Sequence, residues 1–307
     1  MRSEVRRPRA LQRGATLGIA APGGPVEPAR VAEGVALLEK AGFRTWQRED
    51  LGSRRGYLAG DDARRGAELM QLVEDPAIDG IVCARGGYGC DRILGRLDPE
   101  AFRTAAKPLV GYSDVTALLL WQQRCAGLSG FHGPMLELGC ELSPAAVAEL
   151  AGWLTGAGDC PVSLAGQSIH AGFAEGRLLG GSLTLVASSL GTPWEIDTHG
   201  AILLLEEVHE RPYRVDRMLQ QLRFAGKLEG VAGIGYGDLS TCTDDKYGSC
   251  VEDVIGELAE ALGLPCVGGL PFGHVAEHAT WPFGGRATID GDRGEIRILE
   301  RGVEVPT

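Results

Sequence analysis

Residues 108–116 read Pro-Leu-Val-Gly-Tyr-Ser-Asp-Val-Thr, a short apolar run that leads directly into a serine and a helix-forming stretch. The pattern predicts a buried strand over residues 109–112 and a helix over residues 114–125, with Ser113 on the sharp turn between them. Such a turn lifts a hydroxyl above the carboxyl end of a parallel sheet, where open α/β sheets bind ligands. The amide of Asp114 would lie at the amino end of the helix, where it can donate to an oxyanion. Ser113 is therefore a candidate nucleophile, although a serine at this position could also simply cap the helix.

The first half of the chain repeats this alternation of strand and helix. Further strands are predicted at residues 16–21, 78–84 and 128–131, and helices are predicted to begin near Pro28 and at Asp61 or Asp62. Continuous apolar strands that alternate with helices indicate a parallel sheet covered on both faces. Residues 1–156 are therefore predicted to form an α/β domain that carries Ser113.

A second α/β domain is predicted in the other half. Residues 157–176 are rich in glycine, serine and alanine and show no clear period, so we interpret them as a linker. Residues 177–307 hold a second set of alternating elements. These are strands at residues 202–206 and 231–236, helices at residues 213–224 and 251–262, and a closing hairpin of residues 287–290 and 295–299.

Composition and charge argue against several classes of protein. The 307 residues carry a formal net charge of −11, which argues against a nucleic-acid binder, because neutralising phosphates requires a basic surface. The sequence has neither an apolar run long enough to span a membrane nor an apolar segment typical of a signal peptide. Its 8 cysteines include no Cys-x-x-Cys pair, which favours free thiols over a zinc or iron–sulfur site. We therefore expect a soluble, cytoplasmic protein without a cofactor.

A second candidate motif is Ala84-Arg-Gly-Gly-Tyr-Gly89, which also leads from a predicted strand into a helical segment. It lacks the spacing of a phosphate-binding P-loop or of a dinucleotide fingerprint. Two adjacent glycines let the main chain approach a ligand, so Gly86 or Gly87 could donate an amide to an oxyanion. Arg85 or Tyr88 would then lie near the substrate. A plain tight turn is the alternative that the motif alone leaves open.

A serine nucleophile needs a base and an acid that orients the base. Six histidines are available, and His274 lies in a loop rich in glycine and proline, the kind of segment that presents functional groups. Glu206 and Glu207 end the apolar run of residues 202–205, and a buried strand can deliver such a carboxylate into a cleft. A salt bridge at a strand end is the alternative role for Glu206.

The segment His274-Val-Ala-Glu277-His278 also matches the inverted zinc-peptidase motif. Zinc binding would require a helix, so that both imidazoles lie on one face. Proline and glycine flank the segment closely and leave room for little more than a turn or two. The sequence therefore favours His274 as a general base for a serine nucleophile over His274 as a zinc ligand.

In combination, these segments resemble the LD-carboxypeptidases, serine peptidases that trim murein peptides and are related to the microcin C self-immunity hydrolases. The matching stretches keep their order over nearly the whole chain. They are Gly18-Ile-Ala-Ala-Pro-Gly-Gly-Pro25, Ala84-Arg-Gly-Gly-Tyr-Gly89, Gly111-Tyr-Ser-Asp-Val-Thr116, Phe131-His-Gly-Pro-Met135, Leu179-Gly-Gly-Ser-Leu183, Leu190-Gly-Thr-Pro-Trp194, Leu205-Glu-Glu-Val208, Pro212-Tyr-Arg-Val-Asp-Arg217 and Pro271-Phe-Gly-His274. Gly23 departs from the family pattern, in which serine is common at this position.

The resemblance implies a triad of Ser113, Glu206 and His274, with an oxyanion hole formed by the amides of Asp114 and of Gly86 or Gly87. It also implies a flavodoxin-like amino-terminal domain, a smaller carboxyl-terminal α/β domain that supplies the acid and the base, and a homodimer.

The expected reaction is hydrolysis of an L,D-peptide bond that releases the terminal D-alanine of a murein tetrapeptide. Arg85 is our candidate for binding the free carboxylate of that substrate, and a salt bridge to an acidic neighbour is its alternative role. A microcin-type hydrolase would act on a peptidyl or aminoacyl nucleotide and would need aromatic residues to stack on the base. A flavodoxin-like binding protein without catalysis is the remaining alternative.

Overall fold

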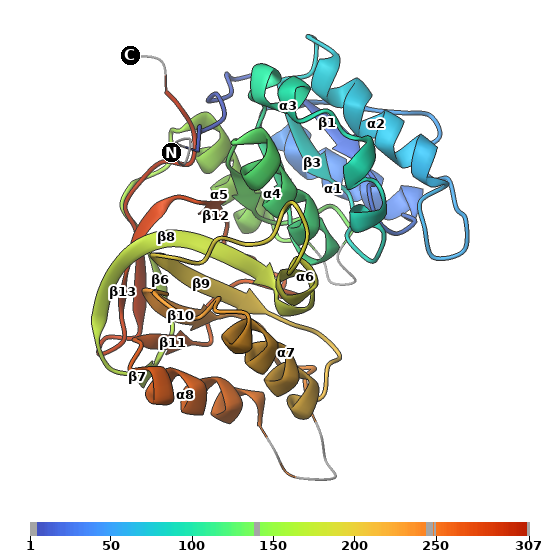
Figure 1. The fold of residues 1–307 in the computed structure, drawn as a ribbon. Helices are drawn as coiled ribbons and strands as arrows, with labels where there is room; N and C mark the ends of the chain where they lie inside the picture. The colour runs from blue at the N-terminus through green and yellow to red at the C-terminus, as the bar shows by residue number, and fades with distance from the viewer. Residues whose placement is uncertain (1–4, 138–141, 244–247, 249, 306–307) are drawn as a thin grey trace. The chain divides into compact units, whose positions relative to one another are not determined.

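The computed structural model describes residues 5–137, 142–243, 248 and 250–305 (Figure 1). The chain divides into two compact units. Unit 1 comprises Met1–Asp159, Ala276–Pro282 and Arg301–Thr307, and unit 2 comprises Cys160–Val275 and Phe283–Glu300. None of the helices in the described ranges has the length and hydrophobicity that a bilayer span requires.

Unit 1 is built on a sheet whose described strands have the order β12-β5-β4-β3-β1-β2. The strands are β1 (Thr16–Ala20), β2 (Arg44–Gln47), β3 (Gly80–Cys83), β4 (Leu109–Gly111), β5 (Gly130–His132) and β12 (Trp281–Phe283). Strands β1 to β5 pair in parallel. The order 2-1-3-4-5, read from β2, is that of flavodoxin-like sheets and confirms the expected fold class.

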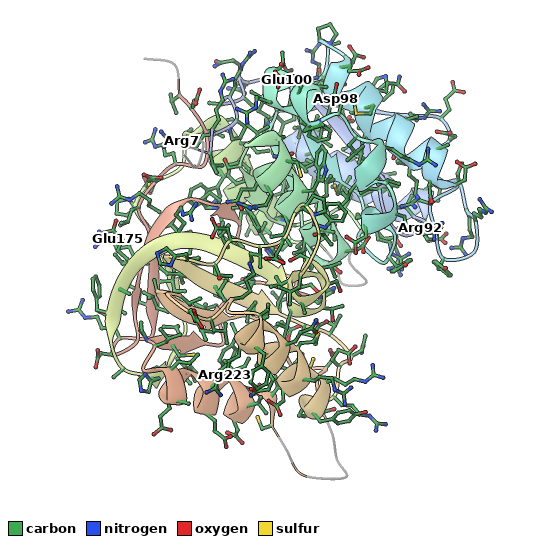
Figure 2. The ribbon with its side chains drawn as sticks, viewed as in Figure 1. Arg7, Arg92, Asp98, Glu100, Glu175 and Arg223 are labelled. Atoms are coloured by element: carbon green, nitrogen blue, oxygen red, sulfur yellow. The ribbon has the colours of Figure 1, made fainter. Side chains whose placement is uncertain are left out.

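Buried strands and capped helices explain why the sequence predicted much of unit 1. All residues of β3, β4 and β5 are buried, and β3 and β4 are apolar along their whole length rather than alternating. The main helices are α1 (Pro28–Lys40), α2 (Asp62–Glu74), α3 (Pro99–Ala105), α4 (Thr116–Trp121) and α5 (Pro144–Thr155). The Asp61 side chain accepts the Arg64 N–H at the start of α2, and Asp98, labelled in Figure 2, accepts the Glu100 N–H at the start of α3.

Unit 2 holds a mixed sheet whose described strands have the order β6-β14-β13-β8-β9-β10-β11-β7. They are β6 (Val162–Ala165), β7 (Gln167–His170), β8 (Phe173–Ser182), β9 (Ala201–Glu206), β10 (Gly233–Tyr236), β11 (Cys266–Gly268), β13 (Arg286–Asp290) and β14 (Glu295–Ile298). Strands β8 to β11 are parallel, whereas β13 and β14 form the antiparallel hairpin that the sequence predicted.

Three helices of unit 2 follow the parallel strands: α6 (Leu183–Ser188), α7 (Pro212–Phe224) and α8 (Val251–Leu262). Helix α7 packs between α6 and α8, and Figure 1 shows α7 and α8 side by side along strands β9 to β11. The helices predicted at residues 213–224 and 251–262 correspond to α7 and α8.

Some parts of the structure differ from the sequence expectation. Residues 157–176, which we interpreted as a linker, contain β6, β7 and the first residues of β8. β6 and β7 are short and largely exposed, so they lack the apolar run that marks a buried strand. The helix expected over residues 114–125 is a 3₁₀ turn (Ser113–Val115), then α4, then a π-helical turn (Gln122–Ala126).

Candidate active site

Ser113 lies on the sharp turn that the sequence predicted. Tyr112 is extended, with φ −151° and ψ −167°, whereas Ser113 has a φ of +58° in the left-handed region. Such a conformation costs a non-glycine residue about 1–3 kcal/mol and is typical of side chains held for function. Within the described ranges, no side chain caps the 3₁₀ turn or α4 at its start. The helix-capping alternative for Ser113 is therefore not what the structure shows.

Gly86 lies close against Ser113, where the site has no room for a side chain at position 86. A Cβ atom built on Gly86 would lie 3.2 Å from Ser113 Oγ and 3.1 Å from the amide nitrogen of Asp114. Gly86, the Ser113 hydroxyl and the Asp114 amide are therefore packed closely together. A site that joins a nucleophile to main-chain oxyanion donors needs such proximity.

The loop that follows β1 lies directly against the loop that follows β3. The Gly24 N–H donates to the Gly86 carbonyl oxygen at 2.7 Å. A Cβ atom at Gly23 would overlap that oxygen and would lie 2.8 Å from Asp114 Oδ2. Glycine at position 23 therefore permits a close main-chain approach that the family's more common serine would have to displace.

Arg85 and Tyr88 have different environments within the second loop. The Arg85 guanidinium donates to the Pro25 carbonyl oxygen at 2.6 Å and lies 3.5 Å from the Glu137 carboxylate. The Tyr88 ring is half-exposed and meets the exposed Tyr57 ring edge to face, with 5.5 Å between their centroids. Arg85 thus has the acidic partner that its alternative role requires, and Tyr88 contributes to an exposed aromatic pair.

In unit 2, β9 brings Glu206 to His274. The Glu206 side chain is fully buried, and its Oε2 lies 3.0 Å from His274 Nδ1. His274 belongs to the loop after β11, which is fixed to the end of β10 because the Phe272 carbonyl accepts the Asp238 N–H at 2.9 Å. Bonding to a carboxylate requires Nδ1 to carry the proton, so Nε2 is the basic nitrogen of the neutral ring.

The neighbouring Glu207 has a different function in the fold. Its Oε2 accepts the Thr184 N–H at 2.7 Å in the first turn of α6, and its Oε1 accepts the Val208 N–H at 3.0 Å. Burial raises the pKa of the Glu207 carboxyl. Of the two adjacent glutamates that the sequence offered, only Glu206 contacts the histidine in the described structure.

Two opposing effects act on the pKa of His274. Burial lowers it, but the hydrogen bond from Nδ1 to Glu206 and the negative charge of that carboxylate raise it. The charges of Asp238 and Glu207 raise it further, so the pKa lies above the ordinary 6.5. The imidazolium is therefore stabilised, as a residue that must accept and hold a proton requires.

The zinc-peptidase pattern lacks the helix that it would need. Residues 273–277 form a series of bends. His274 bonds to Glu206, whereas His278 is buried with its Nε2 3.1 Å from His132 Nδ1. The two imidazoles of the motif thus contact different side chains, Glu206 and His132. The zinc alternative required a helix that places both imidazoles on one face, and the segment is not helical, so this alternative is wrong.

Sequence analysis did not single out Arg65 and Glu137, which contact the loops around Ser113. Glu137 accepts the Glu27 N–H at 2.6 Å, and Arg65 donates to the Gly89 carbonyl oxygen at 2.7 Å. Arg65 lies in a helix rich in charged residues, where the sequence predicts a solvent-exposed side chain. Only its complete burial in the tertiary structure distinguishes it.

We expect Gly86→Ala to abolish hydrolysis, with a loss of about 10²-fold or more, because its methyl group fills the position beside Ser113 Oγ. The φ of Gly86 lies outside the left-handed region, so the fold should survive, as thermal unfolding would verify. Gly95→Ala is the matched control, because a Cβ there meets no atom within 4 Å. Full activity in Gly86→Ala would mean that the close packing of Gly86 against Ser113 is not needed for catalysis.

We expect the imidazole of His274 to titrate above pH 6.5 in an NMR titration and to titrate lower in Glu206→Gln. The variant loses the carboxylate that raises the pKa, while the burial that lowers it remains. Glu207→Gln should lower the His274 pKa less, since Glu207 makes no hydrogen bond to the ring and its charge is the smallest of the effects that raise the pKa. If the two substitutions lowered the His274 pKa equally, the contact with Glu206 would not be what raises that pKa.

Comparison with known proteins shows the family to which the chain belongs. The family models of the LD-carboxypeptidase N-terminal and C-terminal domains match residues 17–133 and 175–289. The “Probable murein peptide carboxypeptidase” of Bacillus subtilis is 34% identical, over 97% of this chain and 95% of its own length. The murein tetrapeptide carboxypeptidase of Pseudomonas aeruginosa is also 34% identical, over 78% of this chain and 82% of its own length.

A solved structure extends the likeness to three dimensions. The muramoyltetrapeptide carboxypeptidase of Oxalobacter formigenes superposes with a TM-score of 0.83 and 30% identity, covering 95% of this chain and 100% of that one. The microcin C7 self-immunity protein of Escherichia coli is a more distant relative, 26% identical over 89% of this chain and 88% of its own length. The chain therefore belongs to the LD-carboxypeptidase family.

Proposed function

We propose that this protein is a serine-type carboxypeptidase that hydrolyses the L,D-peptide bond of a murein tetrapeptide and releases its terminal D-alanine. The substrate is taken from the two relatives and the solved structure whose names state it. The serine type is our inference from the site. The observation that carries it is Ser113, held at a φ of +58° on the turn after β4, with Gly86 packed directly against its side chain and the Asp114 amide.

In the proposed mechanism, Ser113 Oγ attacks the carbonyl carbon of the scissile bond while His274 Nε2 takes the hydroxyl proton. Glu206 keeps the proton of the ring on Nδ1 and stabilises the imidazolium that forms. The amides of Asp114 and of Gly86 or Gly87 donate to the oxyanion, and loss of one such donor costs about 10²- to 10³-fold in rate. His274 then protonates the leaving D-alanine amine, and water hydrolyses the acyl-enzyme.

The proposal assigns the nucleophile to unit 1 and the acid–base pair to unit 2. The predicted domains, a nucleophile domain at residues 1–156 and a second domain at residues 177–307, place the nucleophile, the acid and the base in the same way. They differ from the units in their bounds, since Ala276–Pro282 and Arg301–Thr307 belong to unit 1.

Substrate recognition is proposed for Arg85 and Tyr88, which adjoin the glycines of the second loop. The Arg85 side chain is 39% exposed despite its pairing with Glu137, so a substrate carboxylate could share the guanidinium. The half-exposed Tyr88 ring would contact the part of the peptide that is not released.

We expect the protein to release D-alanine from murein tetrapeptide and Ser113→Ala to lose this activity by roughly 10³-fold or more, because the hydroxyl forms the acyl-enzyme. An enzyme-coupled assay for free D-alanine measures the rate. A tetrapeptide ending in L-alanine is the control substrate and should remain intact. If Ser113→Ala matched the parent rate, Ser113 would not be the nucleophile.

One observation gives the microcin-type alternative some support: the edge-to-face pair of Tyr57 and Tyr88 is an exposed aromatic surface of the kind that can stack on a base. Hydrolysis of an aminoacyl sulfamoyl adenosine by the wild type but not by Ser113→Ala, without D-alanine release, would favour this alternative. We propose the murein substrate as the primary one, because the relatives named for it share more sequence identity.

We also propose that the enzyme is a cytoplasmic homodimer. Cys83, Cys90 and Cys266 are buried thiols outside any disulfide, which suits a reducing compartment. The dimer is inferred from the family resemblance. Light scattering after size exclusion should give twice the mass of one chain, and a mass of one chain at micromolar concentration would contradict the dimer.

A further inference from the structure

Arg65 is fully buried and reaches two of the loops around Ser113. It projects from α2, where its Nη1 donates to the carbonyl oxygens of Pro22 and of Gly89, the latter at 2.7 Å. Its Nη2 donates to Asp62 Oδ1 at 2.6 Å. One guanidinium therefore ties the loop after β1 and the loop after β3 to the same helix.

The other side of the peptide bond after Gly89 is held by Asp114. The Cys90 N–H, which belongs to the same peptide unit as the Gly89 carbonyl, donates to Asp114 Oδ2 at 2.9 Å. A Cβ atom at Gly89, whose φ is +131°, would lie 2.6 Å from Arg65 Nη1. This peptide unit is thus fixed at its carbonyl by Arg65 and at its amide by the residue that follows Ser113.

The charge of Arg65 is balanced inside unit 1. Asp62 also receives Arg92, labelled at the surface in Figure 2, and the hydrogen bond from Arg92 lowers the pKa of Asp62 to about 2. Asp62 therefore stays ionised beside Arg65 over the whole physiological range. Complete burial of an arginine is costly, and an apolar side chain of similar size is often no less stabilising. An apolar side chain could not, however, donate hydrogen bonds to the carbonyl oxygens of Pro22 and Gly89.

We propose that Arg65 is a positioning residue that fixes the Gly86–Gly89 loop against Asp114 and so keeps the oxyanion donors in place beside Ser113. The planar fork of arginine suits this role, because it reaches three acceptors in fixed directions, whereas lysine offers one compact ammonium. The inference rests on the proposed function only in taking Ser113 as the nucleophile.

The test compares Arg65→Met and Arg65→Lys with Lys107→Met. Lys107 is the matched control, because its Nζ also donates to two main-chain carbonyls, those of Leu72 at 2.8 Å and Asp75 at 2.6 Å. Lys107 precedes β4, however, whereas Ser113 follows the carboxyl end of that strand. Each variant is assayed for kcat and KM on murein tetrapeptide, for its melting temperature, and for the rate of Ser113 labelling by a fluorophosphonate.

We expect Arg65→Met to lower both kcat and the labelling rate about 10²-fold, with KM within about twofold, since binding groups are retained while oxyanion donors are displaced. Arg65→Lys should fold and recover part of both rates. Lys107→Met should lower the melting temperature and leave both rates near those of the parent. All assays are run well below the lowest melting temperature, so that every variant is fully folded.

The proposal would be overturned if Arg65→Lys, or a folded Arg65→Met, kept the parent kcat and labelling rate. It would also be overturned if Lys107→Met lost as much rate as Arg65→Met, since the effect would then be one of general stability. Labelling of the parent without D-alanine release would refute only the proposed substrate. A parent that neither labels at Ser113 nor releases D-alanine would refute the nucleophile and the role of Arg65 together.

Discussion

The arrangement of residues at the carboxyl end of the unit 1 sheet depends on one constraint, the strained backbone turn at Ser113. A serine in the left-handed region costs about 1–3 kcal/mol, so its neighbours must hold it there. Tyr112, before it, is fully buried, and its ring lies 4.6 Å from the buried imidazole of His278 between centroids. Asp114, after it, is buried and bonded to the Cys90 N–H. Because both neighbours are fixed, the hydroxyl is presented from one rigid turn.

A site whose donors are main-chain amides needs other groups to hold the main chain. Around Ser113 this is done by glycines, which let the loops approach, and by buried charged side chains, which bond to the peptide groups of those loops. Glu68 on α2 is an example, since it is buried and its Oε2 accepts the Ala21 N–H at 2.8 Å. Arg65, one turn earlier on that helix, bonds to carbonyl groups instead. Helix α2 thus holds, through Glu68 and Arg65, the loops on the oxyanion side of the proposed site.

The proposed acid–base pair, Glu206 and His274, lies within unit 2. The strand β9 buries Glu206, and the loop after β11 brings His274 to it, while Glu207 is occupied by the first turn of α6. Glu206 is the last residue of β9 and Glu207 is the first residue after it, and their carboxylates lie in different environments. Adjacent, chemically equal side chains thereby acquire different partners.

Local sequence determined the elements whose signals are strong over a short range. The apolar runs of β3 and β4 predicted buried parallel strands, and Asp61 marked the beginning of α2. The same local pattern placed Ser113 on its turn, because a strand that leads directly into a helix leaves no other position for it. The order of the motifs along the chain was sufficient for the family resemblance, and hence for the flavodoxin-like sheet.

Tertiary structure decided what depends on contacts between distant residues. The sequence could not assign β6 and β7, because short, exposed edge strands owe their conformation to their neighbours rather than to an apolar pattern. Nor could local residues alone choose Glu206 over Glu207, or show that the imidazoles of His274 and His278 have different partners. The burial of Arg65 was likewise invisible, since a charged residue on a helix is ordinarily solvated. Sequence fixes the local conformation of a turn, whereas partners and burial are set by residues that only folding brings together.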